Sequence, residues 1–233
     1  MVVEHVQKGV AVDTSRPPRG ELTRDAIAAA AQELFLERGY DRTTMRAVAE
    51  RAGVSVGNAY YWFASKEHLV QAFYDRIQVD HAAASATALS RRRTFASRYE
   101  AVLLAWVDVA EPFHEFAGAF FRVAAEPTSP LSPFSAESRP AREAAIALQA
   151  RVVEDSSATI PRALRDDLPE LLWLLQMGVV LFWVHDRSEE QRRTRTLIRR
   201  VVPLVDRALR MSRLPGMGAL VSDLTNTIKA VRA

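Results

Sequence analysis

Apolar residues follow one helical stripe near the start of the chain. Between Thr23 and Gly39 they recur three or four positions apart, which is the spacing of one face of an α-helix. Threonine is a common N-cap and glycine a common residue just beyond a helix C-terminus. We therefore predict a first helix over this segment, with its inner face formed by Ile27, Ala30, Ala31, Leu34 and Phe35.

Two shorter helices follow, separated by Gly53. The first has an apolar stripe that ends at Ala52, and the second is predicted from Val56 to about Phe63. A further helix begins at Lys66. The predicted caps of these three helices are Thr43 or Thr44, then Ser55, then Ser65.

Helical patterns continue through the rest of the chain, and we find no convincing alternation typical of a strand. Four prolines between 127 and 140 interrupt the pattern and predict a loop. The expected fold class is all-α, with a three-helix N-terminal unit followed by a larger helical unit. The later helices are expected near 94–110, 113–126, 137–157, 162–186 and 189–212, with a possible short one over 219–232.

Composition supports a globular chain that stays in a reducing compartment. Of 233 residues, 48% are hydrophobic and 25% charged, which suits a compact core. The absence of cysteine excludes disulfides, thiolate metal sites and cysteine nucleophiles. Residues 1–20 lack an apolar run and contain Arg16-Pro17-Pro18-Arg19, so we interpret them as a flexible arm, either an unstructured tail or a DNA contact, and expect a cytoplasmic protein.

Net charge alone does not argue for nucleic-acid binding. The chain carries a formal charge of +3, but residues 21–66 hold six basic and six acidic side chains. Any DNA contact must therefore depend on a few cations placed on one face.

The two short helices around Gly53 have the form of a helix-turn-helix. Gly53 permits the left-handed backbone that leaves the first helix, and the small Ala49 allows the two helices to cross closely. The other face of the second helix would then point outward. Its side chains, suited to base edges and phosphates, are Ser55, Val56, Asn58, Tyr61 and Trp62.

The run from Thr43 to Glu67 resembles the DNA-binding signature of the tetracycline-repressor (TetR) family. The resemblance covers about 21–75 in detail and the remainder only in helical layout. It implies phosphate contacts from Thr44, Arg46, Tyr60, Tyr61 and Lys66, and base contacts from Ser55, Val56 and Asn58. Tyr60 has core packing as an alternative role and Lys66 a solvated position. Tyr61-Trp62 stands where the family often has histidine and tyrosine, which leaves the role of each ring open.

The segment 171–184 is apolar on nearly every side. Its 14 residues are shorter than the about 20 that cross a bilayer, so we predict a buried helix and no membrane contact. With the next helix it forms a hairpin that can pair with a second copy as a four-helix bundle, which is also the interface the resemblance implies. The expected homodimer therefore uses helices near 162–186 and 189–212, with the arginines of the second as a solvated face.

Aromatic residues gather between 106 and 173, and the resemblance implies a small-molecule effector in such a region. Ordinary core packing is the alternative for any one of them. The predicted effector, mostly apolar with one or two polar handles, would contact Trp106, His114, Phe116, Phe120, Phe121, Arg122, Trp173, Gln176 and Met177.

Enzymatic motifs are weak. Gly53 to Gly57 matches G-x-S-x-G, but a nucleophile elbow needs a strand before the serine, where a helix is predicted. No histidine spacing suggests a metal, and no cofactor is expected. We expect a ligand-released, dimeric repressor on a palindromic operator in duplex DNA, divided into an arm (1–20), a DNA-binding domain (21–66) and an effector and dimer domain (67–233). The alternatives are an activator or ligand-independent DNA-binding protein and, more remotely, an esterase using Ser55.

Overall fold

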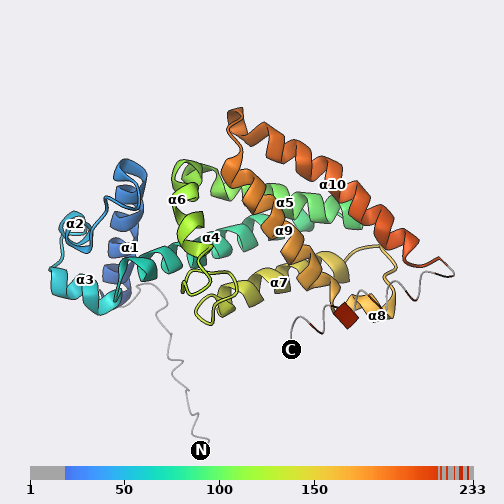
Figure 1. Ribbon diagram of the computed structural model, residues 1–233, viewed down its shortest axis with the longest axis horizontal. Helices are drawn as coiled ribbons and strands as arrows, with labels where there is room; N and C mark the ends of the chain where they lie inside the picture. The colour runs from blue at the N-terminus through green and yellow to red at the C-terminus, as the bar shows by residue number, and fades with distance from the viewer. Residues whose placement is uncertain are drawn as a thin grey trace, which may run out of the picture.

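A computed structural model describes residues 19–214, 216, 219, 223, 226, 227 and 230, apart from the side chains of Arg19, Phe116 and Ala163. All regular structure in this part of the chain is helical, as predicted. Three helices form one end of the molecule, and α4 leads from them into a larger helical body (Figure 1). These four are α1 (Arg19–Arg38), α2 (Met45–Arg51), α3 (Val56–Trp62) and α4 (Lys66–Leu89).

The body consists of helices that pack against α4 and one another. The strongest packing joins α4 to α5, α7 to α9 and α5 to α10. Short 3-10 turns, Glu111–Phe113 and Glu189–Gln191, lead into α6 and α10. The helices are α5 (Phe95–Ala110), α6 (His114–Ala124), α7 (Arg139–Glu154), α8 (Arg162–Arg165), α9 (Leu168–His185) and α10 (Arg192–Met211).

Two predicted boundaries are wrong. The first helix starts at Arg19, directly after two prolines, so Arg19 and Gly20 are helical and Thr23 is not its cap. The helix expected over 162–186 is two helices, because the ring of Pro169 clashes with the carbonyl four residues earlier, at Arg165, where α8 ends. The arm over 1–18 lies outside the described residues, as does most of the segment 219–232.

Buried side chains form two clusters. One fills the body between α4, α5, α7, α9 and α10. The other lies beneath α1–α3, but it also takes in the first half of α4, the end of α6 and Leu131 from the proline-rich loop. The short N-terminal helices therefore do not close their core alone.

The guanidinium of Arg98 joins the ends of two helices. Its Nε donates to the Val152 carbonyl, Nη1 to the carbonyls of Leu89 and Arg92, and Nη2 to the Arg151 carbonyl and the Asp155 carboxylate. These bonds use all five N–H groups of the side chain, which is 3% exposed. Carbonyls near a helix C-terminus have no partner within the helix, so Arg98 satisfies them for both α4 and α7.

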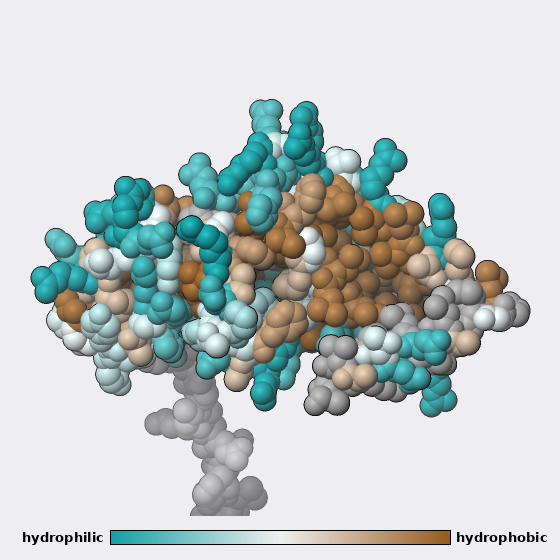
Figure 2. All heavy atoms as spheres, in the orientation of Figure 1, coloured by the Kyte–Doolittle hydropathy of each residue, from teal (hydrophilic) through white to brown (hydrophobic). Residues whose placement is uncertain are grey.

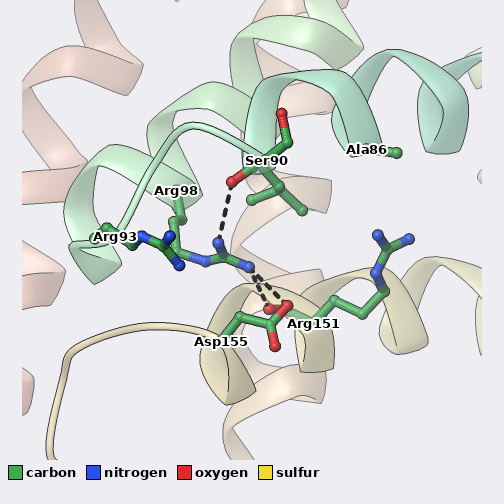
Figure 3. Close-up of a pocket in the computed structure, with 7 residues that line it drawn as sticks. Ala86, Ser90, Arg93, Arg98, Arg151 and Asp155 are labelled. Carbon is green, nitrogen blue, oxygen red and sulfur yellow. Dashed lines mark hydrogen bonds and ion pairs between the residues drawn. The ribbon is translucent and has the colours of Figure 1, made fainter.

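The Arg98 side chain, with the helix ends that it clamps together, lines a surface pocket of about 330 Å³ between α4, α5 and α7 (Figure 3). Asp155 accepts from the same guanidinium at 3.1 Å. Because every donor of Arg98 is already used, its role is to hold the three helices together.

We predict that Arg98→Met lowers the free energy of unfolding by about 3 kcal/mol, because it leaves buried carbonyls unpaired. The exposed Arg91 provides a control, and Arg91→Met should change stability by less than about 0.5 kcal/mol. Urea unfolding of both variants at one protein concentration measures the difference. Equal midpoints for the two would contradict the clamp.

The turn between α9 and α10 depends on Asp186. Its Oδ1 accepts from the amide and hydroxyl of Ser188, and its Oδ2 from the amide and hydroxyl of Thr194. Burial alone raises the pKa of this carboxyl, but the hydrogen bonds from Ser188 and Thr194 outweigh burial and lower the pKa to about 2. The carboxylate form thereby fixes the backbone ahead of α10, including Glu190 and Gln191 with φ of 51° and 49°.

Because the pKa of Asp186 is lower in the folded chain than its ordinary value of 3.8, its contribution is present above about pH 4 and is lost as pH falls toward 2. We expect wild type to exceed Asp186→Asn by about 2 kcal/mol in unfolding free energy at pH 6, and by about half of that at pH 3. Denaturant titrations at several pH values measure the gap. A gap that is independent of pH would count against this assignment.

Candidate nucleic-acid interface and effector cavity

The segment around Gly53 forms a helix-turn-helix with side-chain caps on both helices. Thr44 Oγ1 accepts from the Ala47 amide at 3.2 Å, and Ser55 Oγ accepts from the Asn58 amide at 3.1 Å. Gly53 has φ of 66°, where an L side chain would strain the backbone. The predicted cap Ser55 and the glycine turn are confirmed, and of the two candidates for α2 the cap is Thr44. Ser65 precedes α4 as predicted, but its side chain makes no capping hydrogen bond.

Small residues set the distance between the two helices. Ala49 of α2 and Ala59 of α3 are fully buried, and Val48 packs beside them. Phe63, just after α3, is 3% exposed and closes this core from below. A larger side chain at either alanine would push the helices apart, since a packed interior has no room for added volume.

The opposite side of α3 faces solvent. Val56 and Tyr60 are exposed, and Tyr61 is 79% exposed. Ser55 and Asn58 are exposed at the same surface, as are Thr44 and Arg46 at the start of α2. The structure therefore brings together eight of the nine predicted DNA contacts as side chains at least partly accessible outside the core: Thr44, Arg46, Ser55, Val56, Asn58, Tyr60, Tyr61 and Lys66.

The ninth, Trp62, turns back toward the protein. It is half-buried, and its ring lies against the N-terminal turn of α1, where a Cβ on Gly20 would come within 3.2 Å. Tyr61 meets this ring edge-on with centroids 5.2 Å apart. Trp62 thus props α3 against α1, a role that the sequence pattern did not indicate.

Lys66 is tied to Tyr40. Its Nζ donates to the Tyr40 carbonyl at 2.8 Å and lies 3.9 Å from the centre of the Tyr40 ring. The Tyr40 hydroxyl donates to Glu67, and burial, then the charge of Glu67, raises the pKa of Tyr40, so the hydroxyl stays protonated. An ammonium has three N–H donors and the Tyr40 carbonyl accepts one, so Lys66 has donors left for a further acceptor.

Several of the charged side chains in residues 21–66 are neutralised by ion pairs. Arg51 binds Glu33 and Glu37 on α1, at 3.0 and 2.7 Å. Asp41 lies 3.6 Å from Arg122 on α6. Arg46 is in none of these ion pairs and is exposed beside Thr44 at the start of α2. A phosphate contact requires a cation placed in this way.

An apolar cavity of about 70 Å³ lies in the body, between α4, α5, α6 and α9. Seven of its twelve lining residues are aromatic. They are Phe73, Tyr74, Trp106, Phe113, Phe120, Phe121 and Trp183, and the other five are Ile77, Ala110, Ala117, Val180 and Val184.

The predicted effector residues fall in different places. Trp106, Phe120 and Phe121 line the cavity. His114 does not, but its Nε2 lies 2.8 Å from the carbonyl of the lining residue Trp183. The remaining ones lie elsewhere or outside the described side chains. Trp173 packs on Phe134, Gln176 accepts from Gln149, Arg122 pairs with Asp41, Met177 is half-buried, and the side chain of Phe116 is not described.

Sequence reasoning missed the cavity residues of α4 and α9. Phe73, Tyr74 and Ile77 follow the end of the helix-turn-helix pattern at a spacing that any core helix shows. Trp183 and Val184 lie in the uniformly apolar stretch, where sequence cannot separate cavity from core.

The geometry around Ser55 does not favour the esterase alternative. Ser55 caps α3 directly after a helical segment and not after a strand, so Gly53–Gly57 does not form a nucleophile elbow. Within the described residues no cluster of three histidine or carboxylate side chains is placed to hold a metal ion.

Comparison with known proteins decides the family. Residues 27–73 match the model of bacterial regulatory proteins of the tetR family. Residues 98–224 match the C-terminal domain of tetracyclin repressor-like proteins, which is more than half of the chain. The chain belongs to the TetR family.

Curated relatives named as HTH-type transcriptional regulators match this chain over short stretches. The HTH-type transcriptional regulator TtgR of Pseudomonas putida is 44% identical over 59 residues, 25% of this chain and 28% of TtgR. The repressor BepR of Brucella suis is 41% identical over 54 residues, 23% of this chain and 26% of BepR. The chain thus matches only about a quarter of the length of these relatives.

Solved structures share the fold over much greater length. A TetR regulator from Nitrosomonas europaea superposes with a TM-score of 0.60 at 20% identity, covering 78% of this chain and 97% of that one. Thermus thermophilus FadR, a TetR-family repressor solved with lauroyl-CoA, gives 0.60 at 18% identity, with 77% and 93% covered. At these identities the likeness shows the fold alone.

Proposed function

We propose that this TetR-family chain is a transcriptional repressor that binds a palindromic operator as a homodimer and is released by a small, mostly apolar effector. The observation that carries the proposal is the solvent-facing side of α3, with Ser55, Val56 and Asn58 presented on a capped helix-turn-helix. Asparagine can pair bidentately with adenine, and valine can contact a thymine methyl group. The name of BepR as a repressor supports this direction of control.

The proposed division places the DNA-binding domain at 21–66, the effector and dimer domain at 67–233 and an arm before both. The first turns of α4 complete the N-terminal core with Leu69, Val70 and Phe73, so the boundary lies inside a continuous helix. A cytoplasmic location follows from an operator as target.

Asn58 and Lys66 should affect DNA binding differently. After selection of bound duplexes from a random pool, Asn58→Ala should lose the preference at one base pair, worth about 1 to 3 kcal/mol. Lys66→Ala should weaken binding to all sequences and lower the salt slope by about 1, because one phosphate contact is lost.

Electrophoretic mobility shifts at several salt concentrations give both quantities, with Arg91→Met as an exposed cation control. An unchanged selected sequence for Asn58→Ala would mean that α3 reads bases through another face. A wild-type protein that ignores duplexes at low ionic strength would remove the proposed function itself.

The proposed dimer uses an apolar face that the single chain leaves uncovered. On α9 this face contains Leu174, Leu181 and Phe182, each more than 40% exposed, with Gly178 between them. A side chain at Gly178 would project into open space, so a second helix can approach closely there. Figure 2 shows apolar side chains gathered at the centre and right of the molecule, where Figure 1 places α9 and α10.

The second helix of the hairpin is two-sided. Ile198, Val202 and Leu209 of α10 are buried in their own chain. A separate apolar stripe on α10 is at least partly exposed. Its residues are spaced alternately four and three positions apart, which is the pattern of helices that pack side by side. It consists of Leu197, Val201, Leu204, Ala208 and Met211.

By length and composition alone α9 could cross a membrane. Its inner face, however, packs on α7, α6 and α10, with Leu172, Trp173 and Trp183 buried. A helix with one face in the core and the other apolar and exposed fits a four-helix bundle with a second copy.

We expect Leu181→Arg to convert the protein to monomers at micromolar concentration, because two arginines would face each other in an apolar interface. Val79 on α4 is 63% exposed and lies outside this face, so Val79→Arg should leave the dimer intact. Light scattering after gel filtration measures both masses. Dimers that persist in Leu181→Arg would place the interface elsewhere.

Release by an effector requires that a change at the cavity reach α3. Phe120 offers an indirect route through the N-terminal core: its ring lines the cavity and also meets Phe35 and Tyr40, with centroids 5.6 Å away in both cases. A ligand that displaces Phe120 would shift α1 and the turn before α2. In a dimer this would alter the separation of the two α3 helices, which must match successive major grooves about 34 Å apart.

A further inference from the structure

The walls of the 70 Å³ cavity carry almost no charge. Among its lining residues Tyr74 alone has an ionisable side chain, and burial raises the pKa of Tyr74 to about 12. The hydroxyl is therefore neutral at physiological pH. An anion or cation placed here would lose its hydration without gaining a counter-ion, which makes a charged ligand unfavourable.

One donor in the cavity wall has no partner. Trp183 lines the cavity and is 3% exposed, and its Nε1 makes no hydrogen bond within the described structure. Buried indole N–H groups usually find an acceptor, so an unpaired one beside a cavity indicates a group that arrives with the ligand.

The indole of Trp183 is held in place. Its ring packs edge-on against Trp106 at 5.0 Å and against His114 at 4.7 Å, and the His114 ring donates to the Trp183 carbonyl. A donor that is fixed before binding loses little conformational entropy when an acceptor reaches it.

We propose that the cavity binds an uncharged, single-ring aromatic compound bearing one hydrogen-bond acceptor, which accepts from Trp183 Nε1. The inference rests on the proposed function only in taking this ligand to be the effector. The aromatic walls favour edge-on and offset packing of a ring, and the acceptor sets its orientation.

Size limits the ligand and couples it to α6. An apolar cavity of about 150 Å³ holds benzene, whereas this one has about 70 Å³. A single ring therefore enters only if a wall moves, and a long thioester carrying phosphates, such as lauroyl-CoA, fits neither the volume nor the charge. Phe120 forms part of this wall and contacts the N-terminal core, so ligand entry acts on α1.

The test uses two compounds of the same shape, acetophenone and α-methylstyrene, of which only the first has an acceptor. Calorimetry on the full-length protein should show acetophenone binding about tenfold more tightly. In Trp183→Phe this preference should disappear, while binding of α-methylstyrene stays within about twofold. Trp173→Phe is the matched control, since Trp173 packs on Phe134 outside the cavity, and it should keep the preference.

Wild-type protein labelled with ¹⁵N gives a second readout that does not depend on a folded variant. One indole N–H resonance should move downfield with acetophenone, as a hydrogen bond requires, whereas α-methylstyrene should cause no such downfield shift. Equal affinities for the two compounds, tighter binding of lauroyl-CoA in competition with acetophenone, or a preference kept in Trp183→Phe would each overturn the proposal.

Operator release is measured separately. If acetophenone binds as described and DNA stays bound, the ligand class holds and its role as effector fails. If the protein binds neither ligand, yet binds duplex DNA, the proposed ligand class is wrong, whereas the proposed binding to an operator is not contradicted.

Discussion

The contact among Phe35, Tyr40 and Phe120 is the one on which the rest of the structure depends. Helices α2 and α3 have only seven residues each, and the apolar faces of the first three helices meet the start of α4 and the end of α6. Phe120 lies at the centre of this shared core, with its ring against both Phe35 and Tyr40. The position of α3 therefore depends on helices that belong to the body of the protein.

Tyr40 connects this core to the surface that we assign to DNA. Its ring packs on Phe120, its hydroxyl donates to Glu67 and its carbonyl accepts from Lys66. In the release that we propose, a displacement of Phe120 would reach the start of α4 through Tyr40, where the proposed phosphate contact lies. Such coupling would need no long pathway, because Phe120 belongs both to the cavity wall and to the N-terminal core.

Two buried charged residues in the body fix the arrangement of its helices. Arg98 satisfies carbonyls at the ends of α4 and α7, and Asp186 fixes the turn that orients α10 against α9. Each is a buried charge whose hydrogen bonds are complete, so each specifies one arrangement of helices. The hairpin that results presents its remaining apolar face outward, and this is the face that we propose to pair with a second copy.

The sequence by itself determined the helical class, the cap Ser55, the turn at Gly53 and all of the outward residues of α3 except Trp62, because each depends on neighbours within a few positions. It left the cap of α2 open between Thr43 and Thr44. It also indicated the apolar hairpin. Only the tertiary structure decided that Trp62 turns back to Gly20, that Lys66 binds Tyr40 and that Trp173 and Gln176 lie apart from the cavity. These outcomes depend on how distant helices cross, and periodicity along one helix shows which face is apolar without showing which apolar residue meets a cavity and which meets a neighbouring helix.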